Sequence, residues 1–151
     1  ICTDRIYDAM MKGSANSPEY AVEFFHGYTY SGHPVSCAAA IATLELFQQE
    51  NLFERAGQMG KLLGDALHGG LNGLPNVIGI RALGLAGAVE LSPVAGAPGK
   101  RAYDIFMDCF HHGVLVRPAG ENIVICPPYI VEPAHIERIV TVVGDAIRKN
   151  A

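Results

Sequence analysis

The sequence has no tryptophan, no run of basic residues and no long apolar segment, and only 17% of its 151 residues are charged. Without a stretch of about 20 apolar residues, a membrane-spanning helix is not expected. With few basic residues and a net charge of −4, neither nucleic acid nor an anionic membrane is an expected partner. The amino terminus resembles neither a signal peptide nor a transit peptide, which favours a cytoplasmic protein.

Cysteine is scarce, and its spacing suggests no pairing. The four cysteines (Cys2, Cys37, Cys109 and Cys126) lie far apart and form no CxxC motif. This spacing favours buried free thiols in a reducing compartment over disulfides or a metal site.

The hydrophobic content is 50%, and the length suits one compact domain. A domain of this size buries roughly 70% of the surface that its unfolded chain exposes, so it can form its own core. The low charge indicates that another subunit or domain covers part of the apolar surface.

The apolar periodicity predicts helices that alternate with pairs of strands. The expected helices are 4–12, one from Pro34, one from Asn51 to Gly69-Gly70, 100–112, and one from Pro133 onward. The expected strands are 20–25, 77–82, 88–91, 114–117 and 123–126. Asn51 and Glu54 resemble a capping box. This order predicts a small α+β sandwich, with helices on one face of a mainly antiparallel sheet.

The segment from His26 to Pro34 (HGYTYSGHP) is the densest motif in the chain. Two glycines give it backbone freedom, three hydroxyl groups follow one another, and Pro34 is placed to begin a helix. Backbone N–H groups and hydroxyls beside a helix amino terminus can bind a phosphate. A hydrogen-bonded turn that caps the helix explains the same residues, so these observations leave both interpretations open.

Four segments resemble class III aminotransferases, which depend on pyridoxal 5'-phosphate. They are EFFHGYTYSGHPVSCAAA (23–40), NLFER (51–55), IRALGLAGAVEL (80–91) and GVLVR (113–117). The aromatic Tyr28 before Thr29, and His33 before Pro34, are most similar to the branch of β-alanine (ω-amino acid):pyruvate aminotransferases. The resemblance implies an α/β fold of the fold-type I transferases. Residues 1–45 would end the large cofactor-binding domain, and 46–151 would form the α+β carboxy-terminal small domain.

The resemblance also implies the roles of three residues. Thr29, with the backbone of Tyr28, would contact the phosphate of the coenzyme bound by the neighbouring subunit. Arg117 would bind the substrate carboxylate, a task that suits its planar guanidinium. The implied partners are a small amino donor, a keto acid and further copies of the chain, as a homodimer or homotetramer with shared active sites.

The Schiff-base lysine of such enzymes has no counterpart among the four lysines (Lys12, Lys61, Lys100 and Lys149), which lie in or beside helices with polar neighbours. The family pattern puts this lysine shortly before Ile1. The 151 residues alone are therefore expected to be inactive, and none of them is assigned a catalytic role.

The remaining candidates have structural explanations. For Arg81 we expect an ion pair, and for His26 and His33 hydrogen bonds that support the turn. His111-His112 suits a helix end, and no metal site is expected. Two other functions stay open: a non-enzymatic regulatory or oligomerisation module, and an aminotransferase for ornithine-type or diamine donors.

Overall fold

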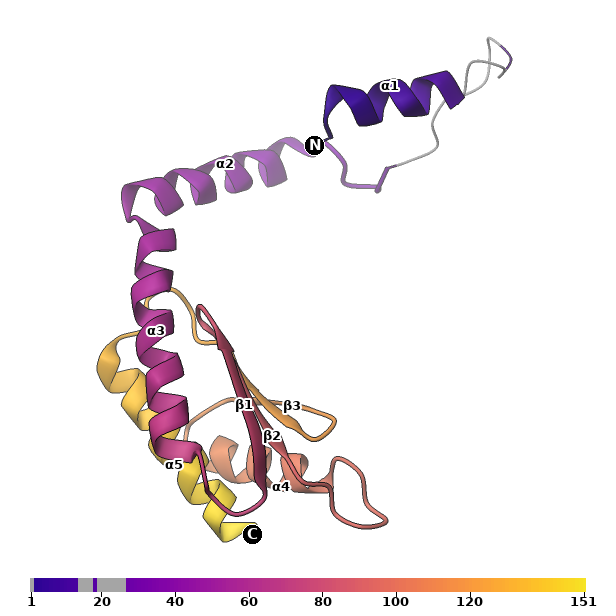
Figure 1. The fold of residues 1–151 in the computed structure, drawn as a ribbon. Coiled ribbons are helices and arrows are strands. Elements are labelled where there is room, and N and C mark those ends of the chain that lie inside the picture. The colour runs from indigo at the N-terminus through magenta and orange to yellow at the C-terminus, as the bar shows by residue number, and fades with distance from the viewer. Residues whose placement is uncertain (1, 14–17, 19–26) are drawn as a thin grey trace. The chain divides into compact units, whose positions relative to one another are not determined.

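The computed structural model describes residues 2–13, 18 and 27–151 (Figure 1). The chain divides into two compact units, Ile1–Thr43 and Leu44–Ala151, and each is described by itself. The predicted strand at 20–25 and His26 lie outside the described residues.

The first unit contains α1 (Asp4–Gly13) and the beginning of α2 (Pro34–Gln49). Both helices begin where the sequence predicts, and Pro34 is the first residue of α2. Glu45 is the only charged residue of α2, yet none of the helix is buried, and Val35 and Ile41 are 71% and 58% exposed. No described helix is long and apolar enough to cross a membrane.

The second unit is built from a four-stranded sheet and three helices after the end of α2. Its elements are α3 (Leu52–Leu71), β1 (Val77–Leu83), β2 (Ala86–Leu91), α4 (Lys100–His111), β3 (Arg117–Ala119), β4 (Asn122–Ile125) and α5 (Pro133–Lys149). The strand order is β1-β2-β4-β3, and all neighbouring pairs are antiparallel. This sheet confirms the antiparallel pattern that the sequence predicts.

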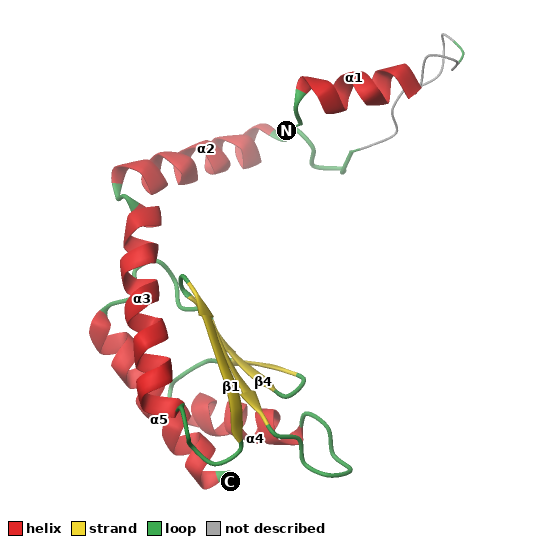
Figure 2. Cartoon of the chain, in the orientation of Figure 1, coloured by secondary structure: helices red, strands yellow, loops and turns green. Residues whose placement is uncertain are grey.

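The helices cover one face of this sheet (Figure 2). Helix α3 packs on β1 and β2, α4 on β3 and β4, and α5 against both helices. Buried and less buried residues alternate along β2 and β4, so one face of each strand joins the core. The fully buried core residues include Leu63, Leu67, Leu71, Val89, Leu91, Ile105, Ile123, Ile136, Val143 and Ile147. The expected sandwich, with helices on one face, is therefore confirmed.

Three local predictions are wrong. Asn51 precedes α3 in the left-handed conformation (φ 49°) and makes no side-chain capping bond, so it forms no capping box with Glu54. The capping box lies instead between Glu132 and His135, at the start of α5. The Gly69-Gly70 pair does not end α3, because the helix continues to Leu71, which is fully buried.

The third wrong prediction is the strand at 114–117. Only Arg117 of that range lies in β3, which continues through Pro118 to Ala119. Val114 and Val116 are buried in the core without strand pairing, and the Val114 amide donates to the Cys109 carbonyl at the end of α4 at 2.9 Å. Proline is tolerated in β3 because this strand lies at the edge of the sheet.

The predicted burial of the cysteines holds at one position. Cys109 is buried, whereas Cys2, Cys37 and Cys126 are exposed, and all four are free thiols. Burial raises the pKa of the Cys109 thiol to about 11, so it is a packing residue in its protonated form.

Gly60 brings α3 into direct contact with the β1–β2 turn. A Cβ atom at this position would collide with the backbone of Gly84, whose φ is +53°. We expect Gly60→Ala to destabilise the chain by roughly 1–3 kcal/mol, because the added Cβ would overlap backbone atoms of Gly84 and force α3 and the turn apart. Urea unfolding of the chain measures this loss.

Gly57 provides the matched control, because it lies in the same helix and a Cβ there would meet no atom within 4 Å. Gly57→Ala should stabilise the chain by about 0.5–1 kcal/mol through the helix propensity of alanine. Equal effects of the two substitutions would show that the close approach at Gly60 has no energetic weight.

Candidate functional site

The segment before α2 forms a closed turn. The Ser31 amide donates to the Tyr28 carbonyl at 2.9 Å, and the Tyr28 amide donates to the Ser31 hydroxyl at 2.8 Å. Gly32 then takes a φ of +70°, a conformation that other residues rarely adopt. These contacts direct the chain from the turn into the first residue of α2.

His33 is the residue that joins this turn to the helix. Its carbonyl accepts the Cys37 amide at 3.0 Å, and its Nδ1 lies 3.4 Å from the Ser36 amide. The imidazole also packs against the Tyr30 ring, with the ring centroids 5.0 Å apart. The supporting role expected for His33 agrees with these contacts.

Thr29 lies at the exposed tip of the turn. Within the described part of the chain, neither its amide nor its hydroxyl makes a hydrogen bond. The Tyr28 amide, by contrast, is engaged by Ser31. Thr29 thus has two donors that no described residue engages, and it precedes by a few residues the 16-residue helix α2, whose amino terminus favours an anion.

Arg117 is the first residue of the edge strand β3. It pairs with Val124, which pairs with Ala88, which in turn pairs with Arg81. These four residues form one row across the sheet. Val124 and Ala88 alternate with buried neighbours on both sides, so the row lies on the face that the helices leave uncovered.

The two arginines of this row differ in their contacts. Arg81 donates to Asn122 Oδ1 at 2.7 Å and lies 3.8 Å from Glu90 Oε2, which confirms the expected ion pair. Arg117 is exposed, and its side chain has no hydrogen bond or ion pair with any residue that the structure describes. Its guanidinium is therefore available to a carboxylate from outside the unit.

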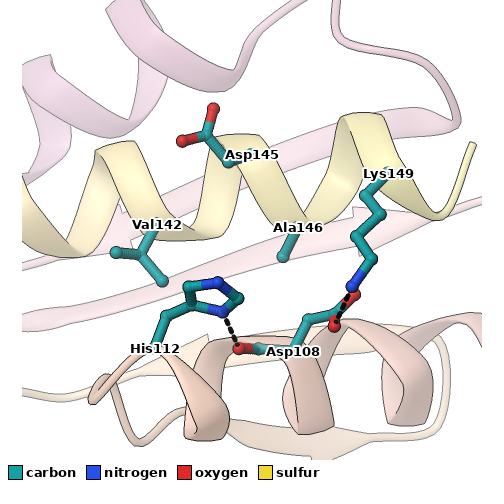
Figure 3. A pocket seen from close by; sticks show the side chains of 6 residues that line it. All are labelled: Asp108, His112, Val142, Asp145, Ala146 and Lys149. Atoms are coloured by element: carbon teal, nitrogen blue, oxygen red, sulfur yellow. Dashed lines mark hydrogen bonds and ion pairs between the residues drawn. The ribbon is translucent and has the colours of Figure 1, made fainter.

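A separate small cleft lies between α4 and α5 (Figure 3). Asp108 accepts hydrogen bonds from Lys149 Nζ at 2.7 Å and from Asn150 Nδ2 at 2.6 Å. The hydrogen bond from Lys149 contributes most, and that from Asn150 next, to holding the pKa of Asp108 below its usual value. The His112 ring contacts the Asp108 carbonyl at 2.7 Å. The cleft has a volume of about 130 Å³. The bonds from Lys149 and Asn150 to Asp108 connect the end of α5 to α4.

The candidate residues belong to different units: Tyr28 and Thr29 to the first, Arg117 to the second. Among residues 2–13, 18 and 27–151, no group of three or more potential metal ligands is assembled. The chemistry that these two sites can offer is therefore anion binding, by hydroxyl and amide donors at one and by a guanidinium at the other.

Comparison with known proteins identifies the family. The model of the class-III aminotransferases matches residues 1–147, and the chain belongs to this family. An ω-aminotransferase of Caulobacter vibrioides is 46% identical over 136 residues, which are 90% of this chain and 30% of that protein. A β-alanine–pyruvate aminotransferase of Pseudomonas aeruginosa is 39% identical over 147 residues, 97% of this chain and 32% of that protein. The chain thus spans about a third of the length of these relatives.

Solved transaminase structures share the fold. A transaminase obtained by ancestral reconstruction matches 99% of this chain and 34% of its own, with 30% identity and a TM-score of 0.83. The match to the ω-transaminase of Pseudomonas jessenii in complex with PMP covers 83% of this chain and 29% of that one, with 34% identity and a TM-score of 0.76. Class III aminotransferases depend on pyridoxal phosphate, and the mixed helix and sheet of this chain confirm the expected fold class.

Proposed function

We propose that the full-length protein transfers an amino group from an ω-amino acid or amine, such as β-alanine, to pyruvate or a similar keto acid. Family membership supports transamination, the name of the Caulobacter relative supports an ω-amino donor, and that of the Pseudomonas aeruginosa relative supports β-alanine and pyruvate. The observation that carries the proposal is the pair of open anion sites, at Thr29 and at Arg117. A phosphate-bearing coenzyme and carboxylate substrates require sites of these two kinds.

Thr29 is the proposed phosphate ligand. A hydroxyl and an N–H that share a dianion form charge-assisted hydrogen bonds, and the amino terminus of α2 adds a favourable field. Tyr28 would contribute its backbone amide. This amide now donates to the Ser31 hydroxyl, and it would have to leave that bond to donate to the phosphate. The bound coenzyme supplies the electron sink that the transfer of the amino group requires.

Arg117 is the proposed ligand of the substrate carboxylate. Its fork of N–H donors matches a carboxylate in two parallel hydrogen bonds, which orients the substrate as well as binding it. No described residue forms a hydrogen bond or ion pair with this guanidinium, so a substrate carboxylate would not have to displace one of them.

The proposed assembly is a cytoplasmic homodimer or homotetramer. Residues 1–45 would belong to the large domain and 46–151 to the small one, and Thr29 would serve the coenzyme of the neighbouring subunit. The exposed apolar length of α2 supports contact with further protein surface, because such a helix is unfavourable in water.

Donor profiling of the full-length protein tests the function. With pyruvate as acceptor, alanine should form faster from β-alanine than from ornithine or a diamine. Arg117 would engage the carboxylate that lies two carbons from the amine of β-alanine; a diamine has no carboxylate, and that of ornithine lies farther from its terminal amine. Chromatography of alanine against time measures both rates. A marked preference for ornithine or a diamine would refute the proposed substrate class.

A further inference from the structure

The hairpin that joins β3 to β4 carries Arg117 at one end and a two-residue turn at the other. Ala119 pairs with Asn122, so Gly120 and Glu121 form the turn. Gly120 has a φ of +57°, and a glycine at the first turn position is typical of type II′ hairpins. Glu121, at the second position, is not required by the turn geometry and therefore needs another explanation.

Glu121 attaches the tip of the hairpin to two other elements. Its Oε1 accepts the Gly99 amide at 2.5 Å, and Gly99 is the residue that precedes α4. Its carbonyl accepts the amide of Leu91, the last residue of β2, at 2.9 Å. A carboxylate at a helix amino terminus is favourable, so the side chain secures the hairpin to the start of α4.

The environment of Glu121 indicates a role beyond solubility. Its Oε2 is buried and has no hydrogen-bond partner within the described residues. A charged oxygen without a partner is costly, and an uncharged residue would avoid that cost. The unfavourable burial of Oε2 therefore accompanies the hydrogen bond that Oε1 accepts from the Gly99 amide.

Arg117 depends on this hairpin for its position. Strand β3 has three residues, lies at the edge of the sheet and pairs with β4 alone. Within the described residues the Arg117 side chain has no hydrogen bond or ion pair of its own to hold it. Strand β3 is held by β4, by its packing on α4 and by the buried Val116 that precedes it, and the two contacts of Glu121 add an attachment at the tip of the hairpin.

We propose that Glu121 is a positioning residue for Arg117: by securing the hairpin to α4, it sets where the guanidinium meets the substrate carboxylate. The inference rests on the proposed function of Arg117. It differs from a general stabilising role because it predicts an effect confined to substrates that carry a carboxylate.

The test compares two donors in the full-length holoenzyme. Glu121→Ala should raise the half-saturating concentration of β-alanine roughly three- to tenfold in the donor half-reaction, because small misplacements of a binding group are costly. The limiting rate should change little. Propylamine, which has no carboxylate, should be affected in neither constant. The absorbance change of the coenzyme without keto acid isolates this half-reaction.

Two further variants sharpen the result. Glu121→Gln retains a carbonyl oxygen to accept the Gly99 amide, so it should restore most of the β-alanine affinity. Glu137→Ala is the matched control, because Glu137 is an exposed glutamate of α5 whose side chain makes no hydrogen bond or ion pair among the described residues. It should leave both donors unchanged.

Equal losses with β-alanine and propylamine, or no loss with either, would overturn the inference. Arg117→Ala separates this failure from that of the underlying function. If it weakens β-alanine while Glu121→Ala does not, the positioning role alone fails. If Arg117→Ala itself leaves β-alanine unaffected, the proposed carboxylate site is wrong.

Discussion

Replacing Arg117 by alanine in the full-length protein is expected to lower kcat/KM for β-alanine by roughly 100-fold, the loss typical of removing one partner of a desolvated charge pair. An amine without a carboxylate should lose little, since it makes no bond to the guanidinium. Steady-state kinetics with β-alanine and propylamine at saturating pyruvate measure the donor contrast. Pyruvate also bears a carboxylate, so its own KM should rise.

Arg117→Lys and Arg81→Ala are the informative controls. Lysine keeps the charge but not the planar fork, so it should recover only part of the lost kcat/KM. Arg81 lies in the same row of the sheet, but its guanidinium is engaged by Asn122 and Glu90. Its removal breaks an exposed ion pair, which contributes little to stability, and should leave the donor preference unchanged. If Arg81→Ala caused a larger loss than Arg117→Ala, the carboxylate would bind at Arg81, and its assignment to Arg117 would be wrong.

Replacing Thr29 by valine should weaken binding of pyridoxal phosphate by roughly 10- to 100-fold, because one hydrogen bond to a charged group is lost. Valine preserves the shape of the side chain and removes its hydroxyl. Spectroscopic titration of the full-length apoenzyme with the coenzyme gives the dissociation constant. Thr29→Ser, which retains the hydroxyl, should remain close to the unmodified protein.

The effect at Thr29 should depend on the phosphate. Pyridoxal, which has none, should bind the valine variant and the unmodified protein equally. A similar loss with both forms of the coenzyme would mean that Thr29 acts on the fold of the turn. In that case the bonds between Tyr28 and Ser31 would account for the motif without a phosphate.

The sequence predicts most of the architecture because the signals that define it are local. Pro34 and Pro133 begin helices since proline suits the first helical position, and both helices start there. Short apolar segments bounded by glycine and proline turns indicate β2 and β4, whose inward residues join the core. These elements need no knowledge of distant contacts to be recognised.

What the sequence misses depends on contacts between distant residues. The helix α3 passes Gly69-Gly70 because Leu71 is buried in the core, and packing outweighs a local stop signal. Glu121 could not be singled out, since its partner Gly99 is 22 residues away and no motif joins them. The open donors of Thr29 follow from the motif, whereas the engagement of the Tyr28 amide by Ser31 does not.

A hybrid dimer tests most directly whether Thr29 binds the coenzyme of the neighbouring subunit. One full-length subunit would lack the Schiff-base lysine, and the other would carry Thr29→Val. If Thr29 acts across the interface, the subunit that keeps its lysine receives an intact threonine from its partner and binds pyridoxal phosphate with unmodified affinity. If the hybrid shows the weak affinity of the Thr29→Val homodimer instead, the threonine serves its own subunit and the account is contradicted.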